Sequence, residues 1–344
     1  MFKNLIKWSD SDHAELPWRK KRTLYGTLVS EIMLQQTTVG TVLSHFDRFL
    51  KLYPTPYDLA QSTEEEVCIA WKGLGYYRRA RNLRKAAIDI VENFDGEIPL
   101  DYEKLISISG VGEYTANAIL SIGADHKALA IDANIERVVS RLYGIKEKKG
   151  PKLQKMIKAL FEEGKVLKDI DKVGARKLNE ALMDLGRVYC QARKANCLNC
   201  PMNKKCLAKE SGEPLSYPIQ EEKKQKFFEL ELLRVVVKKR NKILGYVKSD
   251  DQWLSGQIEL PTFILKSEDK KISQYPILKK KINVDKLKKY KTTITKYKIV
   301  NYIYEIDQDE FDKKFSNLLD VQLFNNDSEK TNLSTASIKA LSLI

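Results

Sequence analysis

Four of the chain's five cysteines lie close together, and this clustering constrains the fold more than any other feature of the sequence. Cys190, Cys197, Cys200 and Cys206 follow the pattern C-x6-C-x2-C-x5-C. Thiolates are soft ligands, and four of them suit either a tetrahedral zinc ion or an iron–sulfur cluster. Structural zinc is usually held by two C-x2-C pairs, whereas here one such pair lies between two single cysteines. The spacing therefore favours an iron–sulfur cluster, with zinc as the alternative.

The composition points to an anionic partner. The 344 residues include 60 Lys and Arg against 46 Asp and Glu, which gives a formal net charge of +14 and a pI near 9.3. Such a chain suits nucleic acid or an acidic membrane surface. No apolar run approaches the roughly 20 residues that cross a bilayer. The N-terminus lacks the apolar core of a signal peptide, so we expect a cytoplasmic protein with reduced cysteines.

Changes in the hydrophobic pattern predict two domains joined by a linker. Over residues 1–210, apolar side chains recur three and four positions apart, and short Gly or Pro breaks separate the segments, as expected for successive helices. Residues 211–226 are polar, contain two prolines and have no period, which is typical of a linker. Residues 227–344 contain runs typical of strands, with a helix expected over residues 310–318. The predicted architecture is an all-α domain followed by a smaller α+β domain.

A glycine hairpin suggests a phosphate site in the helical domain. Gly110 and Gly112 flank one valine and precede an alanine- and isoleucine-rich segment that is typical of a helix. Glycines let backbone amides approach a ligand closely, and the start of the following helix adds a positive dipole. Ordinary turns between helices also use glycine. The cysteine cluster further along the chain strengthens the interpretation of this hairpin as a phosphate site.

Together these motifs resemble a known family. Residues 1–210 are similar to the helix-hairpin-helix DNA glycosylases that carry a C-terminal iron–sulfur cluster, and the cysteine spacing follows that family's pattern. The resemblance implies a 4Fe-4S cluster held by the four cysteines and double-stranded DNA as the partner. Endonuclease III-type members carry a nucleophilic lysine early in the helix after the hairpin, where this chain has Tyr114. Schiff-base chemistry is therefore not expected.

Several segments resemble the adenine DNA glycosylases within this superfamily: LPWR, EIMLQQT, GLGYYRRARNL, IDANIERV and NEALMDLG. Ala133 departs from that branch, which more often has glycine there. Thymine-mismatch glycosylases share the D-A-N sequence, so a thymine or uracil mismatch glycosylase remains an alternative. A non-catalytic iron–sulfur DNA-binding protein is the alternative from a different class, although it would need neither Glu31 nor Asp132.

Two carboxylates are the candidate catalytic groups. Glu31 lies at the edge of its helix's apolar stripe, where partial desolvation raises the pKa of a carboxyl and keeps it protonated near neutrality. Asp132 lies in an otherwise apolar run and suits the N-cap of a helix beginning at Ala133, whose terminus would favour the ionised carboxylate. The two predictions give one carboxyl that donates a proton and one that remains anionic.

The resemblance implies further site residues. It places Glu31, Asp132, Tyr114 and Asn134 in catalysis, and Trp18, Arg19 and Glu180 at the adenine pocket. It also implies a set of DNA contacts: Leu34, Gln35, Gln36, Tyr76, Gly110 and Gly112. Core packing is the alternative interpretation for the aromatic members of both sets.

The C-terminal domain carries most of the excess charge. Residues 221–300 hold 21 Lys or Arg against 10 Asp or Glu, with tyrosines interleaved, which favours a DNA-facing surface over an ordinary solvated sheet. The domain resembles the nudix-like lesion-recognition domain of adenine glycosylases, but the acidic helix of an active nudix hydrolase is absent. That family reads 8-oxoguanine with a Phe-Ser-His turn, and the matching residues here are Ile294, Thr295 and Lys296.

These observations predict a monofunctional adenine DNA glycosylase of base-excision repair. It would act as a monomer, near the nucleoid and without membrane contact, on adenine mispaired with 8-oxoguanine or guanine. Thr295 and Lys296 would contact the DNA. Because the phenylalanine and histidine of the recognition turn are missing, we expect a modest preference for the lesion.

Overall fold

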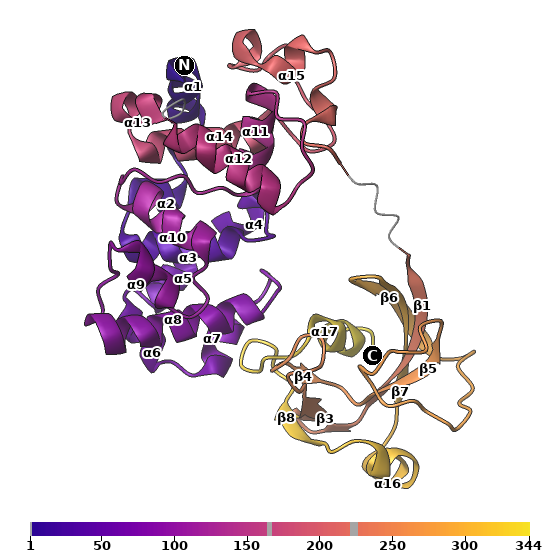
Figure 1. The fold of residues 1–344 in the computed structure, drawn as a ribbon. Helices are drawn as coiled ribbons and strands as arrows, with labels where there is room; N and C mark the ends of the chain where they lie inside the picture. The colour runs from indigo at the N-terminus through magenta and orange to yellow at the C-terminus, as the bar shows by residue number, and fades with distance from the viewer. Residues whose placement is uncertain (1, 164–166, 221–225) are drawn as a thin grey trace. The chain divides into compact units, whose positions relative to one another are not determined.

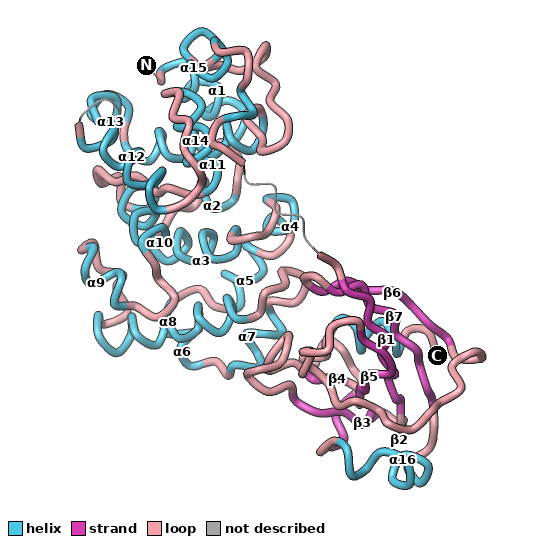
Figure 2. Tube along the Cα trace, turned by 45° about the vertical axis from the view of Figure 1, so that its right-hand side comes forward, coloured by secondary structure: helices cyan, strands magenta, loops and turns pink. Residues whose placement is uncertain are grey.

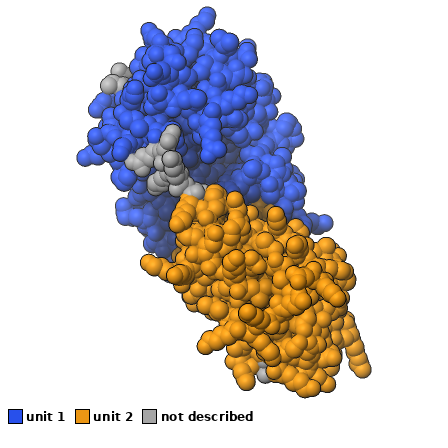
Figure 3. All heavy atoms as spheres, turned by 90° about the vertical axis from the view of Figure 1, so that its right-hand side faces the viewer, with its two compact units in different colours: residues 1–62, 79–222 blue, residues 63–78, 223–344 orange. Residues whose placement is uncertain are grey.

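The structure is a computed structural model that describes residues 2–163, 167–220 and 226–344. The chain divides into two compact units (Figure 3). The helical unit comprises Met1–Ser62 and Arg79–Glu222, and the sheet unit comprises Lys223–Ile344 together with Thr63–Arg78. Among the described residues, no helix is both long and apolar enough to span a bilayer. The part of the expected linker at residues 221–225 lies outside the described residues.

The helical unit is built from helices joined by short connections (Figure 1). They are α1 (Lys3–His13), α2 (Pro17–Lys20), α3 (Leu24–Leu34), α4 (Val39–Leu43), α5 (Phe46–Leu52), α6 (Pro56–Gln61), α8 (Arg78–Phe94), α9 (Tyr102–Ser107), α10 (Glu113–Ala118), α11 (Ala133–Leu142), α12 (Pro151–Glu162), α13 (Leu167–Val173), α14 (Ala175–Val188) and α15 (Leu207–Glu210). Apolar side chains of α1, α11, α12 and α14 form one continuous core cluster with parts of the cysteine loop. This all-α architecture is the one that the sequence predicts for the region.

Helix α3 forms the centre of the unit and carries Glu31. Thr23 caps its start by accepting a hydrogen bond from the backbone N–H of Gly26 at 2.8 Å. Every residue from Tyr25 to Met33 is buried, so the helix has no solvated face. Glu31 is therefore deeply buried, with 5% of its surface exposed, where the sequence predicted only the edge of an apolar stripe.

A buried arginine fixes the end of α3. Arg79, at the start of α8, donates from Nη1 to the carbonyl oxygens of Ile32 and Met33 at 2.9 and 2.7 Å. These carbonyls belong to the last turn of α3, which has no further helical N–H groups to satisfy them. Arg79 Nη2 also donates to Thr37 Oγ1 at 2.9 Å. One side chain thus anchors both the helix end and the segment that follows it.

The expected hairpin lies between α9 and α10. Gly110 has a φ of 77°, and a Cβ there would lie 2.8 Å from the Cβ of Asn82, so only glycine fits. Gly112 is the N-cap of α10, and nothing lies within 4 Å of the position that a Cβ would take there. Helix α10 continues into a π-helical turn at Ile119–Gly123. The hairpin therefore places open backbone at the start of the helix that carries Tyr114.

Among the described residues, the sheet unit combines two four-stranded sheets with the helices α7, α16 and α17 (Figures 1 and 2). The first sheet has the order β5-β1-β7-β6, in which β1 pairs parallel with β7 and antiparallel with β5. The second contains β2, β3 and β4, with β8 paired to β3. The bounds are β1 (Phe228–Val236), β2 (Lys238–Lys239), β3 (Lys242–Val247), β4 (Ile258–Glu259), β5 (Thr262–Ser267), β6 (Lys288–Ile294), β7 (Tyr297–Glu305), β8 (Gln322–Asn325), α7 (Glu64–Ala70), α16 (Gln308–Phe315) and α17 (Thr335–Leu341).

The two C-terminal helices pack near opposite faces of β1. Phe311 of α16 clusters with Leu233 and Val235, whereas α17 clusters with Val236. Side chains alternate between the faces of a strand, which separates these two sets. The sequence predicts α16 within two residues at its start, and it misses α17.

Three charged side chains lie at the centre of the sheet unit. Glu259 is paired with Arg234 and with Lys248, whose Nζ lies 3.1 Å from Glu259 Oε2, and all three are at most 2% exposed. Burial opposes ionisation of Glu259, but the two cations together hold its pKa well below the usual value. Removing one partner of such a network leaves an uncompensated buried charge, so the network restricts how the two sheets can pack.

Candidate active site

A cleft of about 1020 Å³ opens in the helical unit and contains most of the predicted site residues. Its walls come from α2, α3, the hairpin with α10, the start of α11, and α14. The predicted residues that line it are Trp18, Arg19, Glu31, Leu34, Gln35, Gln36, Gly110, Gly112, Tyr114, Asp132, Asn134 and Glu180. Ligand sites usually measure some 300–1,000 Å³, so the cleft can admit a nucleobase with part of its sugar.

Glu31 is held on one wall of the cleft by Tyr114. The Tyr114 hydroxyl donates a short hydrogen bond to Glu31 Oε2. Burial raises the pKa of Glu31 from 4.5 to about 7, the Tyr114 bond opposes this shift, and the nearby carboxylates Asp132 and Glu180 reinforce it. Near neutral pH the carboxyl is therefore present in both its protonated and its ionised form, which suits a group that first gives and later takes a proton.

Asp132 caps α11, as the sequence predicts. Its Oδ1 accepts hydrogen bonds from the backbone N–H groups of Asn134 and Ile135 at 2.9 and 2.7 Å, and its Oδ2 accepts one from Asn134 Nδ2 at 2.7 Å. Burial and the helix terminus act on Asp132 in opposite directions, and the terminus favours the ionised carboxylate in the direction that the sequence predicts. Burial raises the pKa of Asp132, and the hydrogen bonds from Ile135 and Asn134 only partly offset that rise.

Asn134 is fixed between Arg137 and Gly186. Arg137 Nη2 donates to Asn134 Oδ1 and to the carbonyl oxygen of Gly186, each at 2.8 Å, and its Nε donates to the carbonyl oxygen of Cys190 at 2.6 Å. A Cβ at position 186 would lie 2.6 Å from the Asn134 Cβ, so α14 approaches the catalytic turn closely only because it has glycine there. The same guanidinium therefore contacts the Asp132 turn and the first cysteine of the motif.

The predicted base pocket carries an alternating row of charges. Glu180 Oε1 lies 3.3 Å from Arg19 Nε and 2.8 Å from Arg22 Nη2, and Arg19 Nη1 donates to Asp184 Oδ2 at 2.9 Å. Sequence reasoning missed Arg22 and Asp184. Trp18 lines the cleft and also packs edge-on against Phe46 with ring centroids 5.6 Å apart, so the core-packing interpretation and the pocket interpretation both describe it.

The remaining predicted DNA contacts lie in the sheet unit. Tyr76 is 58% exposed and belongs to the segment Thr63–Arg78. Thr295 and Lys296 form the two-residue turn between β6 and β7, where Ile294 pairs with Tyr297. Thr295 has a φ of 50°, a left-handed conformation that β-branched residues rarely adopt.

Lys296 is held by its neighbours. Its Nζ lies 3.1 Å from Asp269 Oδ2, which also accepts a hydrogen bond from the Tyr297 hydroxyl at 2.5 Å. The same ammonium lies 4.7 Å from the ring centroid of Phe228. The predicted recognition turn is thus a tight hairpin braced by a carboxylate and aromatic rings.

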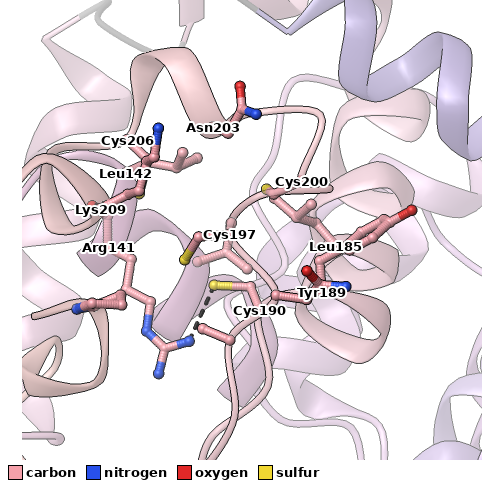
Figure 4. A pocket seen from close by; sticks show the side chains of 14 residues that line it. Arg141, Leu142, Leu185, Tyr189, Cys190, Cys197, Cys200, Asn203, Cys206 and Lys209 are labelled. Atoms are coloured by element: carbon pink, nitrogen blue, oxygen red, sulfur yellow. Dashed lines mark hydrogen bonds between the residues drawn. The ribbon is translucent and has the colours of Figure 1, made fainter. Parts of the chain in front are cut away.

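All four cysteines of the motif line one small cavity beside α11 and the end of α14 (Figure 4). Arg141 Nη1 donates to Cys190 Sγ at 3.2 Å, and its Nε donates to the carbonyl oxygen of Tyr217 at 2.8 Å. Among the described residues, no three Cys, His, Asp or Glu side chains converge on a point where one metal ion would bind. The fifth cysteine, Cys68, lies in α7 and is buried.

Comparison with known proteins assigns the class and then the family. Residues 29–164 match the HhH-GPD superfamily of base excision DNA repair proteins, which is the class that the helical fold and the paired carboxylates define. The chain is 34% identical over 276 residues to the adenine DNA glycosylase of Buchnera aphidicola subsp. Schizaphis graminum, a match that covers 79% of this chain and 76% of that protein. The chain belongs to the adenine DNA glycosylases.

Other relatives agree with this assignment. The adenine DNA glycosylase of Mycobacterium tuberculosis is 33% identical, over 62% of this chain and 69% of that protein. The rat adenine DNA glycosylase is 37% identical, over 60% of this chain and 41% of that protein. Among solved structures, a thermostable thymine-DNA glycosylase superposes with a TM-score of 0.53 and 29% identity, covering 60% of this chain and 94% of that one.

Proposed function

We propose that this enzyme hydrolyses the N-glycosidic bond of adenine paired with 8-oxoguanine or guanine in double-stranded DNA. The observation that carries the proposal is the pair of carboxyls that line one cleft, the buried Glu31 on α3 and the half-buried Asp132 at the start of α11. Each has its own hydrogen-bond partner, Tyr114 and Asn134 respectively. Paired carboxyls of this kind cleave glycosidic bonds by combining a proton donor with a negative charge.

The first step requires the adenine to leave the helical stack, because its sugar bond is inaccessible within the duplex. Protonated Glu31 then donates its proton to N7 of the flipped adenine, which makes the base a better leaving group. Its pKa of about 7 keeps a useful fraction protonated at neutral pH. Tyr114 orients the carboxyl through the hydrogen bond to Oε2.

The second step requires a counter-charge for the oxocarbenium-like sugar. Asp132 supplies it, since its two oxygens are aimed by the α11 backbone and by Asn134. Glu31, now ionised, takes a proton from the attacking water. Among the described residues that line the cleft, none is a lysine, which favours hydrolysis over a Schiff-base intermediate and strand cleavage.

We further propose that the four cysteines hold a 4Fe-4S cluster. They line one cavity with apolar neighbours, and one C-x2-C pair lies between two single cysteines, whereas structural zinc is usually held by two such pairs. A cluster of several irons has a larger body, over which four thiolates can be spread. When bound, it would order the loop that runs from Cys190 to Cys206, close to the cleft residue Arg187.

The sheet unit is proposed to recognise the base opposite the adenine. Its mixed sheet with helices on both faces is compatible with the nudix-like domain that the sequence resembles. The braced turn at Thr295 offers one hydroxyl, which can donate and accept hydrogen bonds. The surrounding lysines supply sequence-independent attraction to phosphates.

One assay tests the function against its nearest alternative. A thymine-DNA glycosylase shares the fold, so thymine or uracil release is the competing activity. Single-turnover reactions on duplexes containing A:8-oxoguanine, A:G, T:G and U:G should release adenine from the first two, and alkali should be needed to break the strand. Release of thymine or uracil but not adenine would contradict the proposal.

A further inference from the structure

The segment Thr63–Arg78 packs with the sheet unit, although the residues on both sides of it in the sequence belong to the helical unit (Figure 3). It contains α7 and a loop that runs from Trp71 to Tyr77. The loop exposes Tyr76, for which the sequence predicts a DNA contact. The contacts that this loop makes within the sheet unit therefore affect the conformation in which Tyr76 is exposed.

Lys72 joins the loop to the C-terminal part of the chain. Its Nζ donates a hydrogen bond to the carbonyl oxygen of Thr331 at 2.8 Å and another to that of Ser328. The carboxylates of Asp327 and Glu329 also attract this ammonium. Two hydrogen-bond acceptors and two nearby carboxylates therefore surround this position, which favours a positively charged side chain there.

A second contact lies at the other end of the loop. Tyr77 is 7% exposed, and its hydroxyl lies next to the buried side chain of Gln257, which directly precedes β4. Burial raises the pKa of Tyr77 to about 12, so the hydroxyl stays protonated. The loop is thus held on both sides of Tyr76 by residues of the sheet unit.

Between these contacts Tyr76 has a strained backbone, whereas the two glycines beside it adopt a positive φ without a steric cost. Gly73, Gly75 and Tyr76 have φ values of 95°, 68° and 49°. The left-handed conformation costs a residue with a side chain roughly 1–2 kcal/mol, and it persists where surrounding contacts over-determine it. Trp71, which is fully buried, adds one such contact by donating from Nε1 to the carbonyl oxygen of Gly75 at 3.1 Å.

We propose that the sheet unit takes part in base excision itself by holding the Tyr76 loop in its DNA-binding conformation, with Lys72 as the positioning residue. The inference rests on the proposed function, because it takes Tyr76 to be a DNA contact. It assigns the sheet unit a role that is independent of the base opposite the adenine. Lys72 acts only through Tyr76 and does not touch the reacting atoms.

A double-mutant cycle on the full chain tests this role. The variants are Lys72→Met, Tyr76→Ala and the pair, with single-turnover excision measured on A:G and A:8-oxoguanine duplexes. A hydrogen-bonded charge lost from a partly buried site should slow excision about tenfold. Lys330→Met is the matched control, because it removes an exposed lysine from the C-terminal segment that contains Ser328 and Thr331. Its Nζ lies 3.9 Å from Asp327 Oδ2.

Lys72→Met should slow excision on both duplexes to a similar extent, and it should have no further effect once Tyr76 is alanine. Lys72→Arg should restore part of the rate, and Lys330→Met should leave it unchanged. Additive effects of Lys72→Met and Tyr76→Ala, or loss of melting temperature without loss of rate, would overturn the positioning role. A Tyr76→Ala variant with normal excision would instead refute the proposed DNA contact, and the positioning role with it.

Discussion

Removing the Tyr114 hydroxyl should shift the pH dependence of base excision to higher pH. The hydrogen bond from Tyr114 holds the pKa of Glu31 below the value that burial alone would give. Because Glu31 acts in its protonated form, the rate falls as pH rises through that pKa of about 7. A hydrogen bond to a charged group contributes about 1.5–3 kcal/mol, and one pKa unit corresponds to about 1.4 kcal/mol. In Tyr114→Phe we expect the alkaline fall to move up by at least about one unit.

The assay is single-turnover excision on an A:G duplex from weakly acidic to alkaline pH. Tyr25→Phe is the matched control, because Tyr25 lies on the same helix as Glu31 and its buried hydroxyl has no hydrogen-bond partner among the described residues. Tyr25→Phe should not change the pH at which the excision rate falls. The assignment of Glu31 as the titrating acid would be refuted if Tyr114→Phe lowered the maximal rate without moving the pH at which the rate falls. A shift of that fall to lower pH would refute it as well.

Four further predictions concern the two carboxyls, the cluster and the recognition turn. Asp132→Asn keeps a good N-cap residue and should fold normally, yet lose about a hundredfold or more in excision; an active variant would remove Asp132 from the mechanism. Glu31→Gln should stabilise the fold at alkaline pH. The pKa of Glu31 rises from its usual 4.5 to about 7 in the native state, so between these pH values only the native state holds the proton. The free energy of unfolding of the wild type therefore falls by about 3 kcal/mol as the pH rises through that range. Denaturant unfolding should show this gain above neutrality and none in acid, and equal gains at both would contradict the buried-carboxyl argument. Cys200→Ser should yield colourless protein without iron when purified anaerobically beside the brown wild type; zinc in the wild type would overturn the cluster. Thr295→Ala should lower the ratio of excision on A:8-oxoguanine to A:G about threefold, and an unchanged ratio would place lesion recognition elsewhere.

The sequence predicts the two candidate carboxyls because their local environments depend on short segments. Asp132 caps a helix that begins at the next residue, which a local pattern can show. Glu31 lies in a nearly continuous apolar run, so its burial follows from its neighbours, although the full extent of that burial depends on packing from every side. The resemblance then adds Tyr114 and Asn134, which the structure brings within hydrogen-bond reach of these two carboxyls.

The missed residues depend on contacts between distant segments. Arg22 lies in a run of basic residues after α2, and Asp184 lies between apolar residues of α14. They line the cleft only because these distant segments meet there. Arg79 opens a helix with several other arginines, and nothing local marks it as the one that caps α3. The buried pair Arg234 and Glu259 has the same origin, since each lies in a strand that would ordinarily place a charge in solvent.

The packing of Thr63–Arg78 with the sheet unit also sets an order on folding during synthesis. Domains generally fold from the N-terminus as the chain emerges from the ribosome. Here the described partners of Thr63–Arg78 include Gln257, Ser328 and Thr331, so this segment cannot reach its native packing until most of the sheet unit has been translated. A stop codon before Ser328 would therefore leave the Tyr76 loop without the hydrogen bonds that Lys72 donates to the C-terminal segment.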